Sequence, residues 1–243
     1  MIAGGDPACG EMNDSGLPWA RLSEGARVLT VDEVERRLQT LPAHRLRGLG
    51  LEVDAPREAG ILVPVLDLGG EAGVVITRRP DTMIYHRGDW VFPGGRVTTA
   101  DATVADAARR EACEELGIPE DRLRVVGQLD SYGPISTGFV IHTFVGVAAP
   151  GTTLAPDPSE VAEVRTMSIS TLLDPAIVSR GGPMPDHEPG PLAVRLADTT
   201  PRAAPPEGYR TALLSFHLGL ADVLWGTQAD ILFNFLSLLT AAR

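Results

Sequence analysis

The chain has 243 residues and a formal charge of −11 at pH 7, from 32 acidic residues against 21 basic ones, and every basic residue is arginine. The absence of lysine excludes Schiff-base chemistry, a Ser-Lys dyad and a phosphate-binding loop of the GxxxxGK[ST] type, because each needs a lysine amine. The acidic balance argues against a nucleic-acid partner, which would need a basic face. An anionic substrate would need something else, such as a bound divalent cation, to screen the carboxylates.

Composition also bounds the compartment and the number of domains. Hydrophobic residues make up 44% of the chain, which is ordinary for a globular protein, and the length suits one or two domains. We find neither a signal peptide nor an apolar run of the ~18 residues that a transmembrane helix needs, so we expect a cytoplasmic protein without a membrane contact. Cys9 and Cys113 form no CxxC motif, so we expect neither a zinc finger nor a structural disulfide.

The first third of the chain predicts a loose start, a short helix and a hairpin. Residues 1–27 are rich in Gly, Asp, Asn and Pro, so we expect them to be poorly ordered. Thr30 is suited to cap a helix over residues 31–41, where apolar residues recur at helical spacing. Residues 61–68 and 73–77 are rich in β-branched side chains and flank a Gly-Gly turn, which is typical of a β-hairpin.

The middle of the chain predicts a central helix between strands. Thr103 offers an N-cap for a helix that ends at Leu116, because Gly117 suits the left-handed position after a helix and Pro119 prevents its continuation. The other predicted elements are a short strand at 90–92, strands at 123–129, 139–147 and 161–167, a helix at 169–173, and a last helix capped by Thr227 and reaching about residue 242.

This order of elements predicts the α/β (α+β) class, with a mixed sheet and helices around one core. We assign residues 28–243 to a single domain with helical extensions at its N- and C-termini. The last helix is apolar over more than half its circumference, so it must be buried in its own core or against a second subunit. A homodimer therefore remains open.

The segment that indicates chemistry is the end of the central helix. Glu111, Glu114 and Glu115 stand at i, i+3 and i+4 and so project from one face, where like charges repel by a few tenths of a kcal/mol per pair. A solvated acidic face is one interpretation. A cluster of hard oxygen ligands for Mg²⁺ or Mn²⁺ is the other, which Gly95 favours, because a tight glycine turn lets a backbone carbonyl approach the metal.

The stretch Gly95 to Ile118 resembles the signature of the Nudix hydrolases, G-x5-E-x7-R-E-[apolar]-x-E-E-x-G-[apolar]. Asp101 stands where glutamate is usual, and eight residues, not seven, separate it from Arg110. The resemblance implies an α/β/α sandwich and hydrolysis of a nucleoside diphosphate linked to another group. It implies Mg²⁺ or Mn²⁺ held by Glu111, Glu114, Glu115 and the Gly95 carbonyl.

The preceding segment is similar to the coenzyme A pyrophosphatase branch of that family. Thr77, Arg79, Gly88 and Phe92–Gly95 match its pattern, and Ile84 stands at a position where that branch has arginine. The resemblance implies coenzyme A or acyl-coenzyme A as substrate, giving 3′,5′-ADP and (acyl-)phosphopantetheine. The alternatives are the same chemistry on ADP-ribose, a dinucleotide or a nucleoside triphosphate, and a domain that senses a nucleotide without hydrolysing it.

The same resemblance suggests roles for individual residues. The catalytic base is one of the helix glutamates, Glu114 or Glu115, or a glutamate from a later loop, for which Glu160 is preferred to Glu163. Arg110 neutralises and orients a carboxylate, and Asp101 is either a ligand or an acid that organises Arg110. The arginines expected to bind substrate phosphates through forked hydrogen bonds are Arg79, Arg87 and Arg96.

Overall fold

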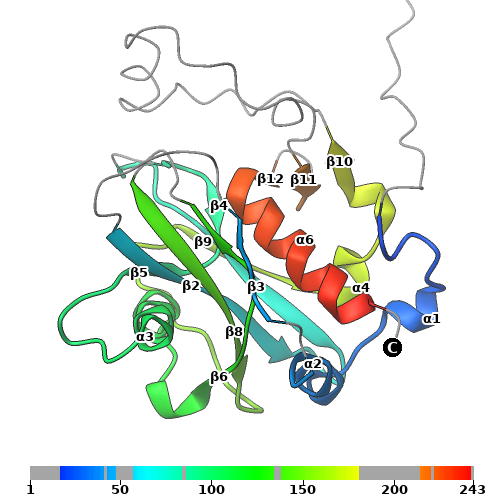
Figure 1. The fold of residues 1–243 in the computed structure, drawn as a ribbon, viewed down its shortest axis with the longest axis horizontal. Helices are drawn as coiled ribbons and strands as arrows, with labels where there is room; N and C mark the ends of the chain where they lie inside the picture. The colour runs from blue at the N-terminus through cyan, green and yellow to red at the C-terminus, as the bar shows by residue number, and fades with distance from the viewer. Residues whose placement is uncertain are drawn as a thin grey trace, which may run out of the picture.

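The computed structural model describes residues 17–40, 43–47, 57–83, 86–133, 138–180, 214–219 and 222–241. Within these ranges the strands form a nine-stranded mixed sheet and a separate three-stranded sheet, with helices on both faces of the larger one (Figure 1). The predicted mixed sheet packed between helices is therefore confirmed.

The larger sheet is built around two long parallel strands. β2 (Arg57–Asp67) pairs in parallel with β8 (Phe139–Ala148) and antiparallel with β3 (Ala72–Arg78). The continuous apolar runs of β2 and β3 suit strands that are buried on both faces. The other strands of this sheet are β1 (Leu46–Arg47), β4 (Trp90–Val91), β5 (Gly94–Arg96), β6 (Leu123–Gln128), β7 (Ser131–Tyr132) and β9 (Glu163–Ser168).

Helices cover the two faces of this sheet unequally. Among the described α-helices, only α3 (Val104–Leu116) packs on one face. It lies very close to β2, since a Cβ at Gly60 would be 2.6 Å from the Val104 carbonyl oxygen. The other face carries the larger apolar core and the helices α2 (Val31–Leu38), α4 (Ile169–Leu172) and α6 (Gly226–Thr240), with α1 (Glu24–Arg27) at its margin (Figure 1). None of the described helices is long and apolar enough to cross a membrane.

Two of the predicted helix starts are confirmed by their caps. Thr30 Oγ1 accepts a hydrogen bond from Glu33 N at 3.2 Å, and Thr103 Oγ1 accepts one from Asp106 N at 3.1 Å. Gly117 follows α3 with φ +64, the left-handed conformation that glycine adopts without strain. These local signals fix where α3 begins and ends, and therefore which way its carboxylates point.

The structure differs from the sequence prediction at the N-terminus. Residues 1–16 lie outside the described residues, but residues 17–27, which we expected to be poorly ordered, pack on the core. The Trp19 side chain is fully buried, and its ring centroid lies 5.3 Å from that of Phe233 in α6. One large aromatic side chain anchors a segment whose remaining composition is typical of a loop, because its burial removes a large apolar area from water.

The C-terminal region also differs. Three strands were not predicted, namely β10 (Val178–Arg180), β11 (Leu214–His217) and β12 (Val223–Trp225), which form the separate sheet. α6 begins at Gly226, with Trp225 in the N-cap position and no side-chain cap, so the predicted Thr227 cap is wrong. The apolar residues of α6 are buried within its own chain, and the homodimer remains a prediction.

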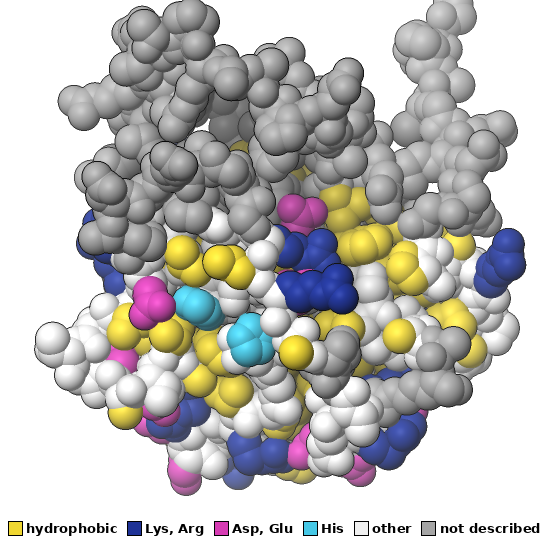
Figure 2. All heavy atoms as spheres, in the orientation of Figure 1, with side chains coloured by type: hydrophobic (Ala, Val, Ile, Leu, Met, Phe, Trp, Pro, Cys, Tyr) yellow, Lys and Arg dark blue, Asp and Glu magenta, His cyan; other side chains and the backbone are white. Residues whose placement is uncertain are grey.

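The acidic side chains are not gathered on the face shown in Figure 2. There they are spread mostly along the lower rim, whereas a compact group of arginine side chains lies near the centre of the view. The formal charge of −11 therefore does not produce a single acidic patch on this face.

Candidate active site

The last turns of α3 bring the predicted carboxylates and one arginine together. Arg110 Nη1 donates to Glu111 Oε1 at 2.8 Å and to Glu114 Oε2 at 3.1 Å. Glu115, one residue further on, turns toward the sheet and is 7% exposed, and its Oε1 lies 3.4 Å from the Gly94 amide nitrogen. The helical spacing thus produces the expected cluster, with Glu114 on the solvent side and Glu115 on the buried side.

Asp101 fixes the position of Arg110. The guanidinium donates to both oxygens of the Asp101 carboxylate, with Nε–Oδ1 at 2.9 Å and Nη2–Oδ2 at 3.1 Å. Thr98 adds donors from its backbone nitrogen and its hydroxyl, each 2.8 Å from Oδ2. These bonds, led by the Arg110 side chain, hold the pKa of Asp101 well below its usual range. The pair with Arg110 is the contact that one of the two roles considered for Asp101, the acid that organises Arg110, requires.

Gly95 leaves room for a carboxylate. A Cβ at this position would overlap the Glu111 side chain, lying 2.5 Å from its Oε1. Gly95 pairs with Gly60 across β5 and β2, so two glycines lie together on the face of the sheet that α3 covers. The absence of side chains here allows α3 to approach the sheet and lets the Glu111 carboxylate lie against the backbone of β5.

The environment of Glu115 disfavours its charged form. Burial raises the pKa of its carboxyl group to about 8, and the nearby charges of Glu160 and Glu111 add to the increase, whereas the Gly94 amide and the charge of Arg79 oppose it. A carboxylate in this position is stabilised when another positive charge lies beside it.

The loop after β8 brings Glu160 near this site. Ala155 N donates to the Leu116 carbonyl at 2.9 Å, and Asp157 N donates to the Glu115 carbonyl at 3.1 Å, so the loop is attached to the end of α3. Glu160 is exposed, and its charge acts on Glu115. Glu163, the other candidate for a base, lies in β9 and forms an ion pair with Arg165 at 3.0 Å.

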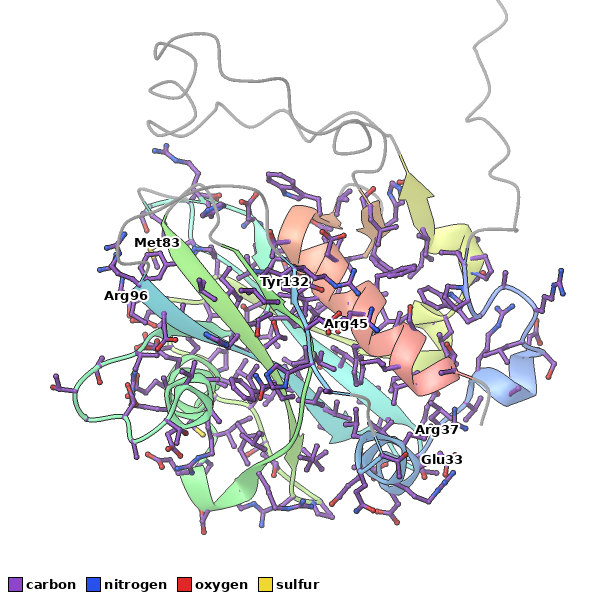
Figure 3. All side chains as sticks on the ribbon, in the orientation of Figure 1. Glu33, Arg37, Arg45, Met83, Arg96 and Tyr132 are labelled. Atoms are coloured by element: carbon purple, nitrogen blue, oxygen red, sulfur yellow. The ribbon has the colours of Figure 1, made fainter. Side chains whose placement is uncertain are left out.

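The three arginines expected to bind phosphates differ in their surroundings. Arg79 Nε is buried and has no hydrogen-bond partner among the described residues, and its charge acts on Glu115. Arg87 is exposed, and no ion pair with another described residue is found for it. Arg96 projects from the end of the sheet where β2 begins (Figure 3), and its carbonyl oxygen accepts from Arg110 Nη2 at 3.3 Å. Arg79 is therefore the arginine with an unmet donor beside the carboxylates.

The C-terminal region contacts β4 and the residues that lead from it to Gly94 and Gly95 in β5. Gln228 Oε1, in the first turn of α6, accepts from Phe92 N at 3.0 Å. Trp90 Nε1 donates to Asp222 Oδ1 at 3.0 Å. Sequence reasoning missed these contacts, because only the folded chain brings together residues more than 130 positions apart. In the sequence, the only local sign of these contacts was the amide side chain of Gln228, near the start of the predicted last helix.

Comparison with known proteins gives the family. The sequence profile of the NUDIX domain matches residues 56–186, which is more than half of the chain. The chain belongs to the Nudix hydrolase family. The matched region contains all of the Nudix signature and the residues that precede it, and it excludes α6 and the segments before residue 56.

Several curated Nudix relatives are similar to this chain. A Nudix hydrolase NudL of Photorhabdus laumondii, described as uncharacterized, is 34% identical over 120 residues, covering 49% of this chain and 63% of the relative. The NudL protein of Cronobacter sakazakii, described in the same way, is 35% identical over 145 residues, covering 60% of this chain and 72% of the relative. This chain thus spans less than two thirds of the Photorhabdus relative.

Solved structures of Nudix proteins resemble it more distantly. The Nudix hydrolase RenU of M. smegmatis has a TM-score of 0.38 at 23% identity, covering 49% of this chain and 75% of that one. The NUDIX domain of Shewanella oneidensis NrtR, solved with ADP ribose, has a TM-score of 0.39 at 15% identity, covering 50% of this chain and 78% of that one.

The residues of this Nudix site suit a divalent cation by the chemistry of their donors. Among the described residues, no group of three or more His, Cys, Asp or Glu side chains is already arranged around a common point. The Glu111 and Glu114 carboxylates accept from Arg110, and Glu115 accepts from Gly94. The oxygens of these three carboxylates are nevertheless hard ligands of the kind that Mg²⁺ and Mn²⁺ prefer. Because Gly95 has no Cβ, the Glu111 carboxyl group can lie against the backbone of β5.

Proposed function

We propose that this protein hydrolyses a diphosphate bond in a nucleoside diphosphate derivative, with Mg²⁺ or Mn²⁺ as cofactor. The observation that carries the proposal is the carboxylate cluster of α3 lying against the glycine backbone of β5. The buried Glu115 carboxyl, with its pKa raised to about 8, is a site where a bound cation would favour the charged form.

Glu111, Glu114, Glu115 and the Gly95 carbonyl would hold the cation. When bound, a divalent cation screens the negative charge of the diphosphate and lowers the pKa of the attacking water. Arg110 orients two of the carboxylates through one guanidinium nitrogen, and the buried Asp101 carboxylate keeps that guanidinium in place. This arrangement positions the ligands before a substrate arrives.

The remaining roles fall to Arg79 and to a glutamate. Arg79, with its unmet Nε donor, would bind a substrate phosphate. Glu160 or a glutamate of α3 would accept the proton of the attacking water. The water oxygen forms a bond to one phosphorus, the bond from that phosphorus to the bridging oxygen breaks, and two phosphate monoesters leave.

We infer coenzyme A or an acyl-coenzyme A as the substrate, with 3′,5′-ADP and (acyl-)phosphopantetheine as products. The support is the resemblance of the segment from Thr77 to Gly95 to the coenzyme A pyrophosphatase branch. Gly88 of that pattern has φ +71, a conformation that glycine adopts without strain, and its amide closes the loop onto the Arg79 carbonyl at 3.2 Å. ADP-ribose, dinucleotides and nucleoside triphosphates are the alternative substrates.

A substrate panel with Mg²⁺ and with Mn²⁺ tests this function, with the products identified by mass spectrometry. We expect 3′,5′-ADP from coenzyme A, and we expect Glu114→Gln and Glu115→Gln to lower turnover sharply while the protein stays folded. Glu120→Gln is the matched control, because Glu120 is exposed just beyond α3 and pairs with Arg109. Cleavage of another nucleotide but not of coenzyme A would refute the substrate. Nucleotide binding without any turnover would indicate a sensing domain.

A further inference from the structure

Two reciprocal contacts join the C-terminal region to the chain beside Arg79. Trp225 Nε1, at the end of β12, donates to Asp89 Oδ1 at 3.4 Å, and Trp90 Nε1 donates to Asp222 Oδ1 at 3.0 Å. Each side of this contact supplies one indole and one carboxylate. Two consecutive residues at the start of β4 are therefore held by side chains from near the end of the chain.

The Asp89 side chain also supports a tight turn over residues 86–89. Its Oδ2 lies 3.0 Å from His86 Nδ1, and the Asp89 amide donates to the His86 carbonyl at 3.2 Å. His86 has φ +55, and among the described residues it is the only one other than glycine with a positive φ. Such a conformation persists where the surrounding contacts hold it. The buried Asp89 carboxylate is one of these contacts.

This turn is paired with the backbone of Arg79. Arg79 N donates to the Asp89 carbonyl at 2.9 Å, and Gly88 N donates to the Arg79 carbonyl at 3.2 Å. These two bonds continue the pairing of β3 with β4 beyond Arg78 and Trp90. The position of the turn therefore determines the point from which the Arg79 side chain extends.

The Arg79 guanidinium lies near the α3 carboxylates. Burial raises the pKa of Glu115, and the charge of Arg79 opposes that rise, which it can do only from nearby. Arg79 Nε is buried and has no hydrogen-bond partner among the described residues. A guanidinium is a planar fork that binds phosphate in a defined orientation, so its hydrogen bonds weaken when its backbone is displaced.

We propose that Asp89 is a positioning residue for Arg79: held by Trp225, it fixes the turn that places the Arg79 guanidinium where a substrate phosphate binds. This inference rests on the proposed function, in which Arg79 binds that phosphate. Asp89 acts through Arg79 and takes no part in the chemical step. The C-terminal region, which lies outside residues 56–186 of the NUDIX profile, thereby contributes to substrate binding.

Steady-state kinetics with coenzyme A and with ADP-ribose test this role. We expect Asp89→Ala to raise KM about tenfold and to change kcat less than about twofold, because ground-state binding of a phosphate is lost. Asp89→Asn should restore most of the affinity, since its amide oxygen can still accept from the Trp225 indole. Trp225→Phe should raise KM as Asp89→Ala does. Trp19→Phe is the matched control and should keep the native KM, because Trp19 is a buried tryptophan whose Nε1 has no partner among the described residues.

A double-mutant cycle shows whether the effect passes through Arg79. In an Arg79→Gln background, Asp89→Ala should change KM by less than about twofold, because the guanidinium that it displaces is absent. In an Arg87→Gln background it should still raise KM about tenfold. Additive losses in both backgrounds would refute the positioning role. If Asp89→Ala does not fold, Trp225→Phe replaces it in the same cycle.

A binding measurement separates this role from the proposed reaction. Calorimetric titration with coenzyme A and with ADP-ribose, without a divalent cation, needs no turnover, and we expect the same coupling of Asp89 with Arg79 in Kd. Coupling without cleavage of either nucleotide would refute the reaction and support the role. Cleavage with additive losses would support the reaction and refute the role, and so would native binding and cleavage in Arg79→Gln.

Discussion

The Gly95→Ala variant tests the contact between the glycine turn and the α3 carboxylates. The new Cβ would overlap the whole Glu111 carboxyl group, of which Oε1, at 2.5 Å, is the most distant atom. Ordinary contacts begin at 3.4 Å, so the group must retreat by at least about 0.9 Å or rotate away. A misplacement of about 1 Å in a catalytic group can lower the rate about 100-fold, which corresponds to about 2.7 kcal/mol. We therefore expect kcat/KM to fall by that factor and the Mg²⁺ concentration for half-maximal rate to rise.

Stability should change little in this variant. Gly95 does not have a positive φ, and the overlapping atoms are the end of a flexible side chain, so the free energy of unfolding should stay within about 1 kcal/mol. Gly94→Ala should unfold more easily, because its Cβ would lie 2.8 Å from the Ile61 Cα. Gly25→Ala, with open space around it, is the neutral control.

Steady-state kinetics and denaturant unfolding measure both effects. The double variant Gly95→Ala with Glu111→Gln should be no less active than Glu111→Gln alone, because both changes act on one carboxylate. Native activity in Gly95→Ala would contradict the reasoning, and so would a loss of activity that is explained by unfolding.

Three further predictions concern other parts of the structure. Gln228→Ala removes the acceptor for Phe92 N and should lower kcat/KM about tenfold, whereas Gln228→Glu keeps an acceptor oxygen and should restore most of the rate in the same assay. Asp101→Asn should lower the free energy of unfolding by about 2 kcal/mol at pH 7, the cost of breaking a partly buried pair. The folded state lowers the pKa of Asp101, so this stabilisation is present above the ordinary Asp pKa of 3.8 and is lost as the pH falls below it. The unfolding curves of the native protein and of Asp101→Asn should therefore converge in acid. A difference that stays constant with pH would contradict the pairing. Burial raises the pKa of Cys113 to about 11, so in a Cys9→Ser background its thiol should react with iodoacetamide at pH 8 only after unfolding; rapid labelling of the native protein would contradict its burial.

Local signals predicted the central part of the site. The cap at Thr103 and the glycine after Leu116 fixed α3, and helical periodicity placed Glu111 and Glu114 within reach of one arginine. Each of these features depends on residues within about one or two helical turns of each other in the sequence, the range over which sequence patterns best predict structure.

The parts that were not predicted depend on contacts far apart in the sequence. The support of the Phe92 backbone by Gln228 and the contact of Asp89 with Trp225 arise from packing, which leaves no local pattern. The packing of the segment around Trp19 was missed for a related reason, since composition averages over a window and hides one buried aromatic residue.

The contacts of the C-terminal region with Trp90 and Phe92, just before the glycines of β5, have a consequence for how the chain folds. Gln228 and Asp222 lie 136 and 132 positions after the residues that they hold, so these contacts close very long loops. Such contacts form late, because the entropy of loop closure is lost before they contribute. During synthesis, the helix that carries the carboxylates can form well before the glycine turn opposite it is fixed. On the proposed function, the emerging chain therefore gains its activity only after the segment from Asp222 to Gln228 has left the ribosome and packed on β4 and Phe92.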